Sequence, residues 1–126
     1  MCDITPSVEV ALPADLSAAR RARAFVRESL CPRHHPGVTE PALLLVTELA
    51  VNAVAHGAPP VTAGLDCRGG TVRLMVSDGS RTRPTHVHAR LDSESGRGVA
   101  LVDLLSSDWG VQVTGAGKTV WCDLPA

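Results

Sequence analysis

Three polar side chains recur at every fourth position of an otherwise apolar segment. Glu48, Asn52 and His56 lie in the sequence ALLLVTELAVNAVAHG, residues 42–57. Four residues advance an α-helix by slightly more than one turn, so these side chains line one stripe of a predicted helix. The stripe could be a solvated face or a ligand site. An Asn carboxamide oxygen suits Mg²⁺, and a carboxylate one turn earlier can orient or deprotonate a nucleophile beside that ion.

A second candidate site is the sequence VSDGS, residues 76–80, at the end of an apolar segment. The carboxylate of Asp78, just after a predicted strand, can accept the exocyclic N–H of adenine. Gly79 would let the base come close to the backbone. An ordinary Asp-Gly turn is the alternative interpretation of the same residues.

The third candidate is SGRGV, which opens a predicted helix and ends at Val99. Gly96 and Gly98 can present free backbone N–H groups to an anion at the helix N-terminus, and Arg97 adds a charged donor. A flexible loop that enters a helix is the alternative. The segment lacks the P-loop pattern, and it does not follow a first strand as the dinucleotide-binding fingerprint does.

The composition is that of a single globular domain, residues 1–126. A chain of 126 residues buries roughly two-thirds of its unfolded surface, so it needs no disulfide or structural metal. Twelve Lys+Arg and 13 Asp+Glu give a formal charge of -1, which provides no strong attraction to nucleic acid. Two Trp, one Phe and no Tyr leave no stacking platform for single strands. Direct nucleic-acid binding is therefore not expected.

The cysteines and the N-terminus favour a cytoplasmic protein. Cys2, Cys31, Cys67 and Cys122 are far apart and form no CxxC pair, which indicates reduced thiols. The first residues contain acid and proline where a signal peptide needs a basic segment and an apolar core. No apolar run reaches the roughly 18 residues of a membrane span, so no membrane partner is expected.

Hydrophobic periodicity predicts strands and helices in an α+β order. The predicted strands are 7–12, 60–67, 71–78, 109–115 and 117–124. The predicted helices are 13–30 with Asp15 as N-cap, 39–56 with Thr39 as N-cap, and 95–108. Strands grouped beside helices predict one mostly antiparallel sheet with helices on one face.

The order of the motifs resembles the GHKL ATPase superfamily. ELAVNAVAHG is followed by VSDGS, GRGVALVDLLSSDWGV and GKTVW. Within the superfamily, the chain is similar to small bacterial ATP-binding proteins related to anti-sigma factor serine kinases, from SVEVALPAD to VWCDL. The resemblance implies a Bergerat-type two-layer α/β sandwich that binds ATP and Mg²⁺. It also implies a mobile lid over residues 81–94.

The resemblance also implies roles for individual residues. Asn52 matches the Mg²⁺ ligand, and Glu48 matches the residue that positions the attacking hydroxyl or water. The other implied nucleotide contacts are Asp78 and Gly79 at adenine, Gly96, Arg97, Gly98 and Val99 at the phosphates, and Thr119 near an adenine-bound water. The sequence departs from the superfamily at Ser80, where the second box usually has glycine.

The function implied by the resemblance is ATP-dependent phosphorylation of a serine or threonine on an antagonist (anti-anti-sigma) protein. The same protein would sequester a sigma factor, and it could form a homodimer. The alternative is a non-catalytic ATP-binding adaptor that regulates transcription by sequestering a partner.

Several other side chains have an ordinary structural interpretation. His86 and His88 could share a metal ion, but no third ligand is nearby in sequence. Lys118, the only lysine, could reach a phosphate or an acid, although a lysine at a strand start is usually solvated. Trp109 and Trp121 are expected to pack in the core. The arginines at 20, 21 and 23 are expected on a solvated helix face.

Overall fold

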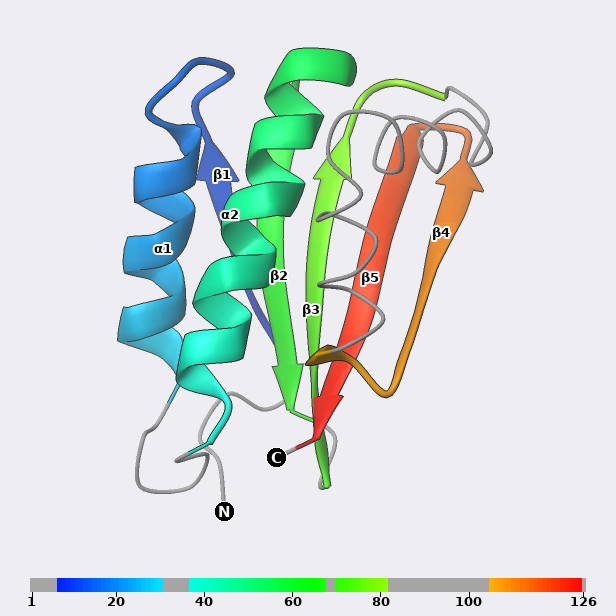
Figure 1. Cartoon of the computed structure of the whole chain (residues 1–126). Helices are drawn as coiled ribbons and strands as arrows, with labels where there is room; N and C mark the ends of the chain where they lie inside the picture. The colour runs from blue at the N-terminus through cyan, green and yellow to red at the C-terminus, as the bar shows by residue number, and fades with distance from the viewer. Residues whose placement is uncertain (1–6, 31–36, 68–69, 82–104, 126) are drawn as a thin grey trace.

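Two helices cover one face of a five-stranded sheet (Figure 1). The structure is a computed structural model, and it describes residues 7–30, 37–67, 70–81 and 105–125. The elements in chain order are β1 Val8–Leu12, α1 Ala18–Ser29, α2 Thr39–His56, β2 Val61–Cys67, β3 Thr71–Asp78, β4 Asp108–Thr114 and β5 Gly117–Pro125. The predicted α+β class is confirmed, and most of the predicted helix 95–108 lies outside the described residues.

The sheet has the strand order β1-β2-β3-β5-β4, and every neighbouring pair is antiparallel. β2 with β3 and β4 with β5 form two antiparallel pairs of strands that are consecutive in the chain. The pairing of β3 with β5 joins these two pairs, with Thr71 opposite Pro125 at one end and Asp78 opposite Lys118 at the other. The end of β3 and the start of β5 therefore lie side by side in the middle of the sheet.

Strand residues alternate between a face that the helices cover and an open face. In β3, Val72, Leu74, Val76 and Asp78 are buried, whereas the residues between them are half-buried. This period of two is the geometry of a strand with one face in the core. Asp78 therefore continues the core-facing row, although it is charged.

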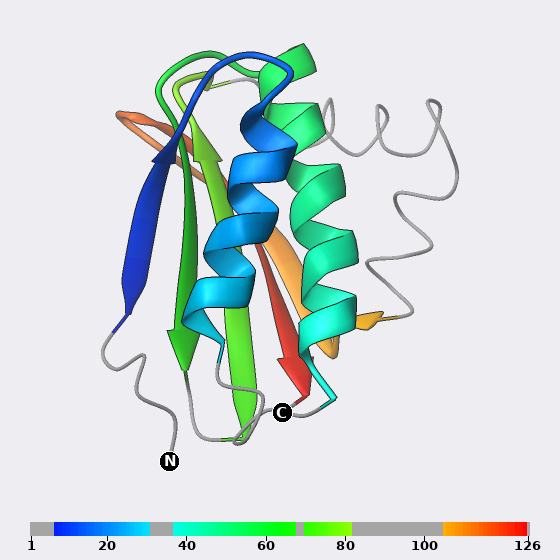
Figure 2. The same ribbon diagram turned by 90° about the vertical axis from the view of Figure 1, so that its left-hand side faces the viewer.

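The helices form the second layer (Figure 2). α2 buries alanine, leucine and valine side chains at Ala42, Leu43, Leu45, Val46, Leu49, Ala50 and Ala53. α1 packs beside it through Ala18, Ala22, Phe25 and Val26. Arg23 of α1 donates to Thr47 Oγ1 of α2 at 3.1 Å, so Arg23 joins the two helices and does not lie on a purely solvated face. Neither described helix combines the length and the apolar character that crossing a membrane requires.

The helix starts differ from the sequence prediction. α1 begins at Ala18, and Asp15 lies in the preceding turn, where it accepts from the N–H and the hydroxyl of Ser17 at 2.8 and 2.6 Å. These hydrogen bonds lower the pKa of Asp15. Thr39 is the first residue of α2, so it is not the N-cap. Its Oγ1 is buried without a hydrogen-bond partner. Side-chain caps were predicted from residue type, but α1 begins later than a cap at Asp15 requires and α2 begins at Thr39 itself, and neither helix has a side-chain cap hydrogen bond.

The two tryptophans lie on opposite faces of the sheet. Trp109 is partly buried and packs against the core, as predicted. Trp121 pairs with Gly110 and lies on the open face, which corrects the prediction that it packs in the core. The guanidinium of Arg73 lies 4.0 Å from the centre of the Trp121 ring and donates to Asp123 at 2.7 and 2.9 Å. The hydrogen bonds to Asp123 raise the pKa of Arg73, so this side chain stays charged on the open face.

Burial in the core predicts that the Cys122 thiol is unreactive. This side chain is 1% exposed, and burial raises its pKa to about 12. Because the thiolate is the reactive form, iodoacetamide at pH 8 should modify Cys122 only after unfolding. Peptide mass spectrometry with and without urea measures this, with the half-buried Cys67 as the internal comparison. Equal labelling of Cys122 in the folded and unfolded protein would contradict its placement in the core.

Candidate functional site

A buried ion pair lies at the end of β3. Nζ of Lys118 is 3.2 Å from Oδ1 and 3.1 Å from Oδ2 of Asp78, and the two residues are 5% and 7% exposed. The Ser80 backbone N–H donates to Oδ1 at 2.8 Å. The expectation that Lys118 is solvated is wrong. The register places Lys118 opposite Asp78, and paired residues point to the same face of the sheet.

The C-terminal end of α2 comes into contact with Asp78. The Gly57 N–H donates to Ala53 O at 2.9 Å and closes the helix. A Cβ on Gly57 would lie 2.5 Å from Cγ and 2.6 Å from Oδ2 of Asp78. Only glycine fits between the helix end and the carboxylate. Gly57 therefore both ends α2 and allows this close approach.

The polar stripe of α2 runs along the flank that faces away from α1. At 100° per residue, Thr47, which contacts α1, is on one flank of α2, and Glu48, Asn52 and His56 are on the other. All three are half-buried. The rise of an α-helix puts Glu48 and His56 about 12 Å apart along the axis. Since His56 precedes Gly57, the stripe leads directly to Asp78.

The stripe has free hydrogen-bonding capacity. Glu48 and Asn52 form no hydrogen bond or ion pair with other residues in the described ranges. In Figure 1, the half of the sheet formed by β5 and β4 lies beyond this flank, and neither α1 nor α2 covers it. The arrangement offers a carboxylate and a carboxamide at one end and a buried carboxylate at the other, which suits an elongated ligand with a base and an anionic group.

Thr119 lies away from this stripe. Its Oγ1 is 2.7 Å from Oγ of Ser77, its partner in the β3–β5 register. Because residues alternate along a strand, both hydroxyls point to the face opposite the Asp78 carboxylate. They line a shallow cavity of about 220 Å³ whose lining also includes Asp78 and Lys118. The Thr119 hydroxyl is hydrogen-bonded to Ser77, and the side chain that contacts the Asp78 carboxylate from β5 is Lys118.

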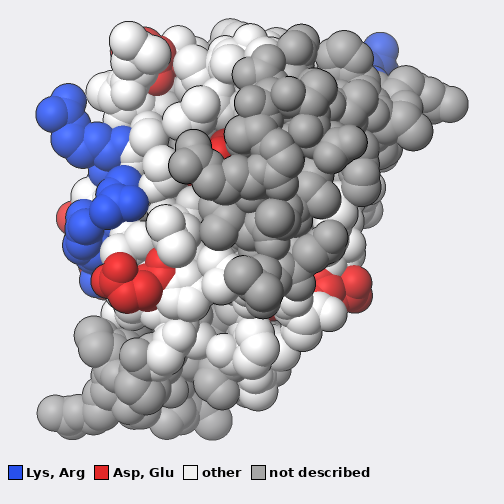
Figure 3. Space-filling model, viewed as in Figure 1, with Lys and Arg blue, Asp and Glu red and all other residues white. Residues whose placement is uncertain are grey.

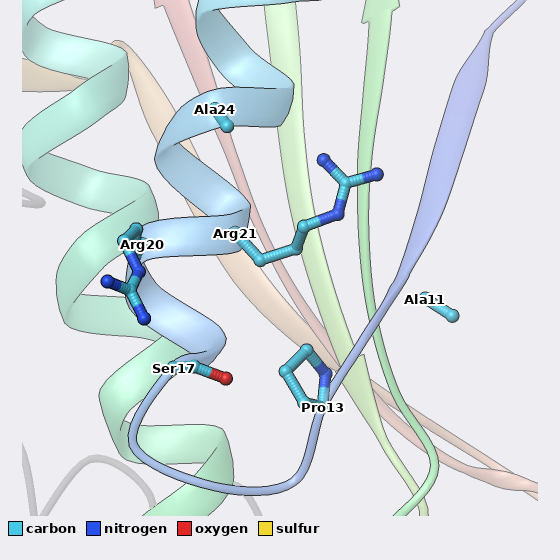
Figure 4. Close-up of a pocket in the computed structure, with 6 residues that line it drawn as sticks. All are labelled: Ala11, Pro13, Ser17, Arg20, Arg21 and Ala24. Atoms are coloured by element: carbon cyan, nitrogen blue, oxygen red, sulfur yellow. The ribbon is translucent and has the colours of Figure 1, made fainter.

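A second cavity, of about 340 Å³, lies between the start of α1 and β1 (Figure 4). Its lining includes the exposed Arg20 and Arg21, and basic side chains gather over the α1 side of the molecule (Figure 3). None of its lining residues belongs to the stripe or to the Asp78–Lys118 pair. Arg20 and Arg21 are on a solvated face, as predicted.

A magnesium ion would depend on more than the described side chains. Among the described residues, no group of three or more His, Cys, Asp or Glu could hold a metal ion. Asn52 can provide one oxygen ligand, which fits an ion that keeps several waters and shares its shell with phosphates. Outside the described residues lie the predicted phosphate contacts Gly96, Arg97, Gly98 and Val99, the histidines His86 and His88, and nearly all of the predicted lid.

The comparisons with known proteins identify the family. A model of the histidine kinase-like ATPase domain matches residues 12–123, and the chain belongs to this family. The chain is similar to the crystal structure of the RsbU and RsbW domains of Rv1364c from Mycobacterium tuberculosis, with 25% identity and a TM-score of 0.66. The match covers 97% of this chain and 33% of that one, so this chain spans a third of its length. No curated protein sequence gives a match.

These findings confirm two predictions made from the sequence. The resemblance to the GHKL ATPases is confirmed by the family match. The Bergerat-type α/β sandwich is confirmed by the antiparallel sheet with helices on one face and by the structural match. Membership of this ATPase family implies that the chain binds ATP.

The contact between Gly57 and Asp78 predicts that a single added methyl group at Gly57 destabilises the fold. Gly57→Ala forces a Cβ to within 2.6 Å of both Asp78 Oδ2 and Ala53 O. We expect a loss of about 1–3 kcal/mol in the free energy of unfolding, typical of overpacking. Urea denaturation measures it. Gly115→Ala is the matched control, because nothing lies within 4 Å of its Cβ. Equal stability of the two variants would show that α2 does not end against Asp78.

Proposed function

We propose that this protein binds Mg·ATP along the stripe of α2 and transfers the γ-phosphoryl group to a serine or threonine of an antagonist protein. The observation that carries the proposal is the continuity of the stripe. Glu48, Asn52 and His56 line one flank of a helix whose last turn touches Asp78, in a chain of the histidine kinase-like ATPase family. Base and phosphates then occupy opposite ends of one site.

The base end uses Asp78. A carboxylate held by strand and turn hydrogen bonds can accept from the exocyclic amine of adenine without reorganising. Gly57 supports this role, because its lack of a side chain lets the end of α2 lie against the carboxylate and fix its position relative to the helix. Gly79 follows Asp78 directly and donates its N–H to Ala58 O at 2.6 Å, which fixes the turn after the carboxylate.

The phosphate end uses Glu48 and Asn52. Glu48 orients the incoming hydroxyl and accepts its proton as the new O–P bond forms and the bond to ADP breaks. Asn52 supplies a neutral oxygen to Mg²⁺, which neutralises phosphate charge when it is bound. We assign the remaining phosphate contacts to Gly96, Arg97, Gly98 and Val99 from the family motif.

The proposed biological role is partner switching in the cytoplasm. Its support is the resemblance to anti-sigma factor kinases and the similarity to a chain that carries an RsbW domain. The protein would sequester a sigma factor and phosphorylate the antagonist that competes for it. The family resemblance adds a homodimer to this proposal. Mg·ATP binding without any transfer to an antagonist would instead make it the non-catalytic adaptor.

Replacing Glu48 separates catalysis from nucleotide binding. Glu48→Gln keeps the shape and the polarity of the side chain but removes the base, so transfer should fall by about 10²–10⁴-fold. Affinity for Mg·ATP should stay unchanged. Radiolabel transfer to antagonists and calorimetry measure the two quantities. Glu40→Gln is the control, because Glu40 lies exposed on the first turn of the same helix. Transfer by the Glu48→Gln protein at the normal rate would exclude the assigned role.

Replacing Asn52 tests its role as a metal ligand. Asn52→Ala removes the proposed Mg²⁺ ligand, so affinity for Mg·ATP should fall roughly tenfold or more, as for other losses at metal sites. Affinity for ATP measured in EDTA should stay the same. Val51→Ala, at an exposed neighbouring position, controls for truncation of the helix surface. An equal loss with and without Mg²⁺ would mean that Asn52 contacts the nucleotide and not the ion.

A further inference from the structure

We infer that Lys118 is a specificity residue for the base: its ammonium donates to ring nitrogen N1 of adenine, beside the exocyclic amine that binds Asp78. The inference rests on the proposed nucleotide binding. It adds a direct contact from β5, at the position where the resemblance predicted only a nearby hydroxyl at Thr119. Three features of the molecule support it: the burial of Lys118, its hydrogen-bonding capacity and the position of the backbone around it.

Burial of this lysine is unusual for its residue type. Lys118 is the only lysine of the chain, and its side chain is 5% exposed. Lysine is almost never fully buried unless it is paired, since removing an ammonium from water is costly. Pairing with Asp78 offsets that cost, but an apolar pair would join β3 to β5 at least as well. Strand pairing alone therefore does not account for an ammonium at this position.

The ion pair keeps unused hydrogen-bonding capacity. An ammonium has three donors, and a carboxylate has about four acceptor sites. Oδ1 accepts from the Ser80 N–H and from Lys118, whereas Oδ2 is contacted by Lys118 alone among the described residues. At least one acceptor site on Oδ2 and one N–H on Nζ remain. They lie next to each other, because Nζ and Oδ2 are 3.1 Å apart.

A neighbouring donor and acceptor match the edge of adenine. Its exocyclic amine donates, and the adjacent N1 accepts, so the amine pairs with Oδ2 while N1 pairs with Nζ. Hypoxanthine has the opposite pattern, with an oxygen acceptor in place of the amine and an N–H at N1. In the same pose it would place oxygen against carboxylate and N–H against ammonium. The pair therefore selects adenine by charge and hydrogen-bond polarity.

The backbone lies close around the pair and fixes its position. Gly57 has no side chain beside Oδ2, and a Cβ there would come within 2.6 Å of that oxygen. Gly117, directly before Lys118, has φ +151°, and a Cβ on it would collide with the backbone of Asp78. This glycine lets β5 begin against the end of β3, which places Nζ at the carboxylate. A cavity of about 220 Å³ includes both Asp78 and Lys118 in its lining, so open space adjoins the pair.

The test changes the nucleotide, so that folding is not affected. Calorimetry with the wild-type protein and Mg²⁺ compares ATP, 1-deaza-ATP, in which C–H replaces N1, and ITP. A lost hydrogen bond to a charged group corresponds to roughly ten- to hundredfold weaker binding of 1-deaza-ATP. ITP should bind more weakly still. 7-Deaza-ATP is the matched control and should bind like ATP, because it changes a ring atom away from this edge.

A protein variant then assigns the effect to Lys118. In Lys118→Met, which keeps a long side chain without a donor, ATP and 1-deaza-ATP should bind with equal affinity. Circular dichroism verifies that this variant is folded. The nucleotide series on the wild-type protein tests the inference even if the variant does not fold. If 1-deaza-ATP or ITP binds to the wild type as tightly as ATP, the inference is wrong and the proposed function survives. If the folded wild type binds no ATP, the proposed function itself fails.

Discussion

The ion pair between Asp78 and Lys118 is the constraint that connects the sheet to the site. Both charges are buried on the face that otherwise holds the apolar core, so each depends on the other. The pair exists only in the observed register of β3 and β5. A slip of one residue would turn Lys118 to the open face and leave Asp78 buried without a counter-charge. The register of the two central strands and the electrostatics of the site are thus one property of the fold.

Around this pair, three chain segments come into close contact at glycines. A Cβ on Gly57 would clash with the Asp78 carboxylate, one on Gly79 with the backbone of Pro59, and one on Gly117 with the backbone of Asp78. Such contacts fix the end of α2 relative to the sheet. Because Glu48 and Asn52 are on the same helix, their distance from Asp78 is set by the helical rise and not by a loop. A rigid helix anchored at one end is a suitable support for a site with two functional ends.

Much of this arrangement could be predicted from local patterns, and the rest depended on long-range pairing. The strands and the Glu48 stripe follow from periods of two and 3.6, which neighbouring residues determine. The burial of Lys118 follows from pairing with a strand about 40 positions earlier, as the contact to Asp78 shows. A signal was nevertheless present, because Lys118, Cys122 and Leu124 alternate on one face, and the last two are buried. That alternation also turns Thr119 away from Asp78.

The two ends of the candidate site differ in how function and stability are coupled. At the base end, Asp78 and Lys118 lie in central strands, and removing one charge leaves the other buried and unpaired, which costs several kcal/mol. Specificity there cannot be altered without altering stability. At the other end, Glu48 and Asn52 are half-buried side chains on a helix flank and have no partner among the described residues. They can change without disturbing the core. In the proposed site, catalysis could therefore be lost while nucleotide binding is kept, because the proposed contacts to the base are the same interactions that hold the sheet.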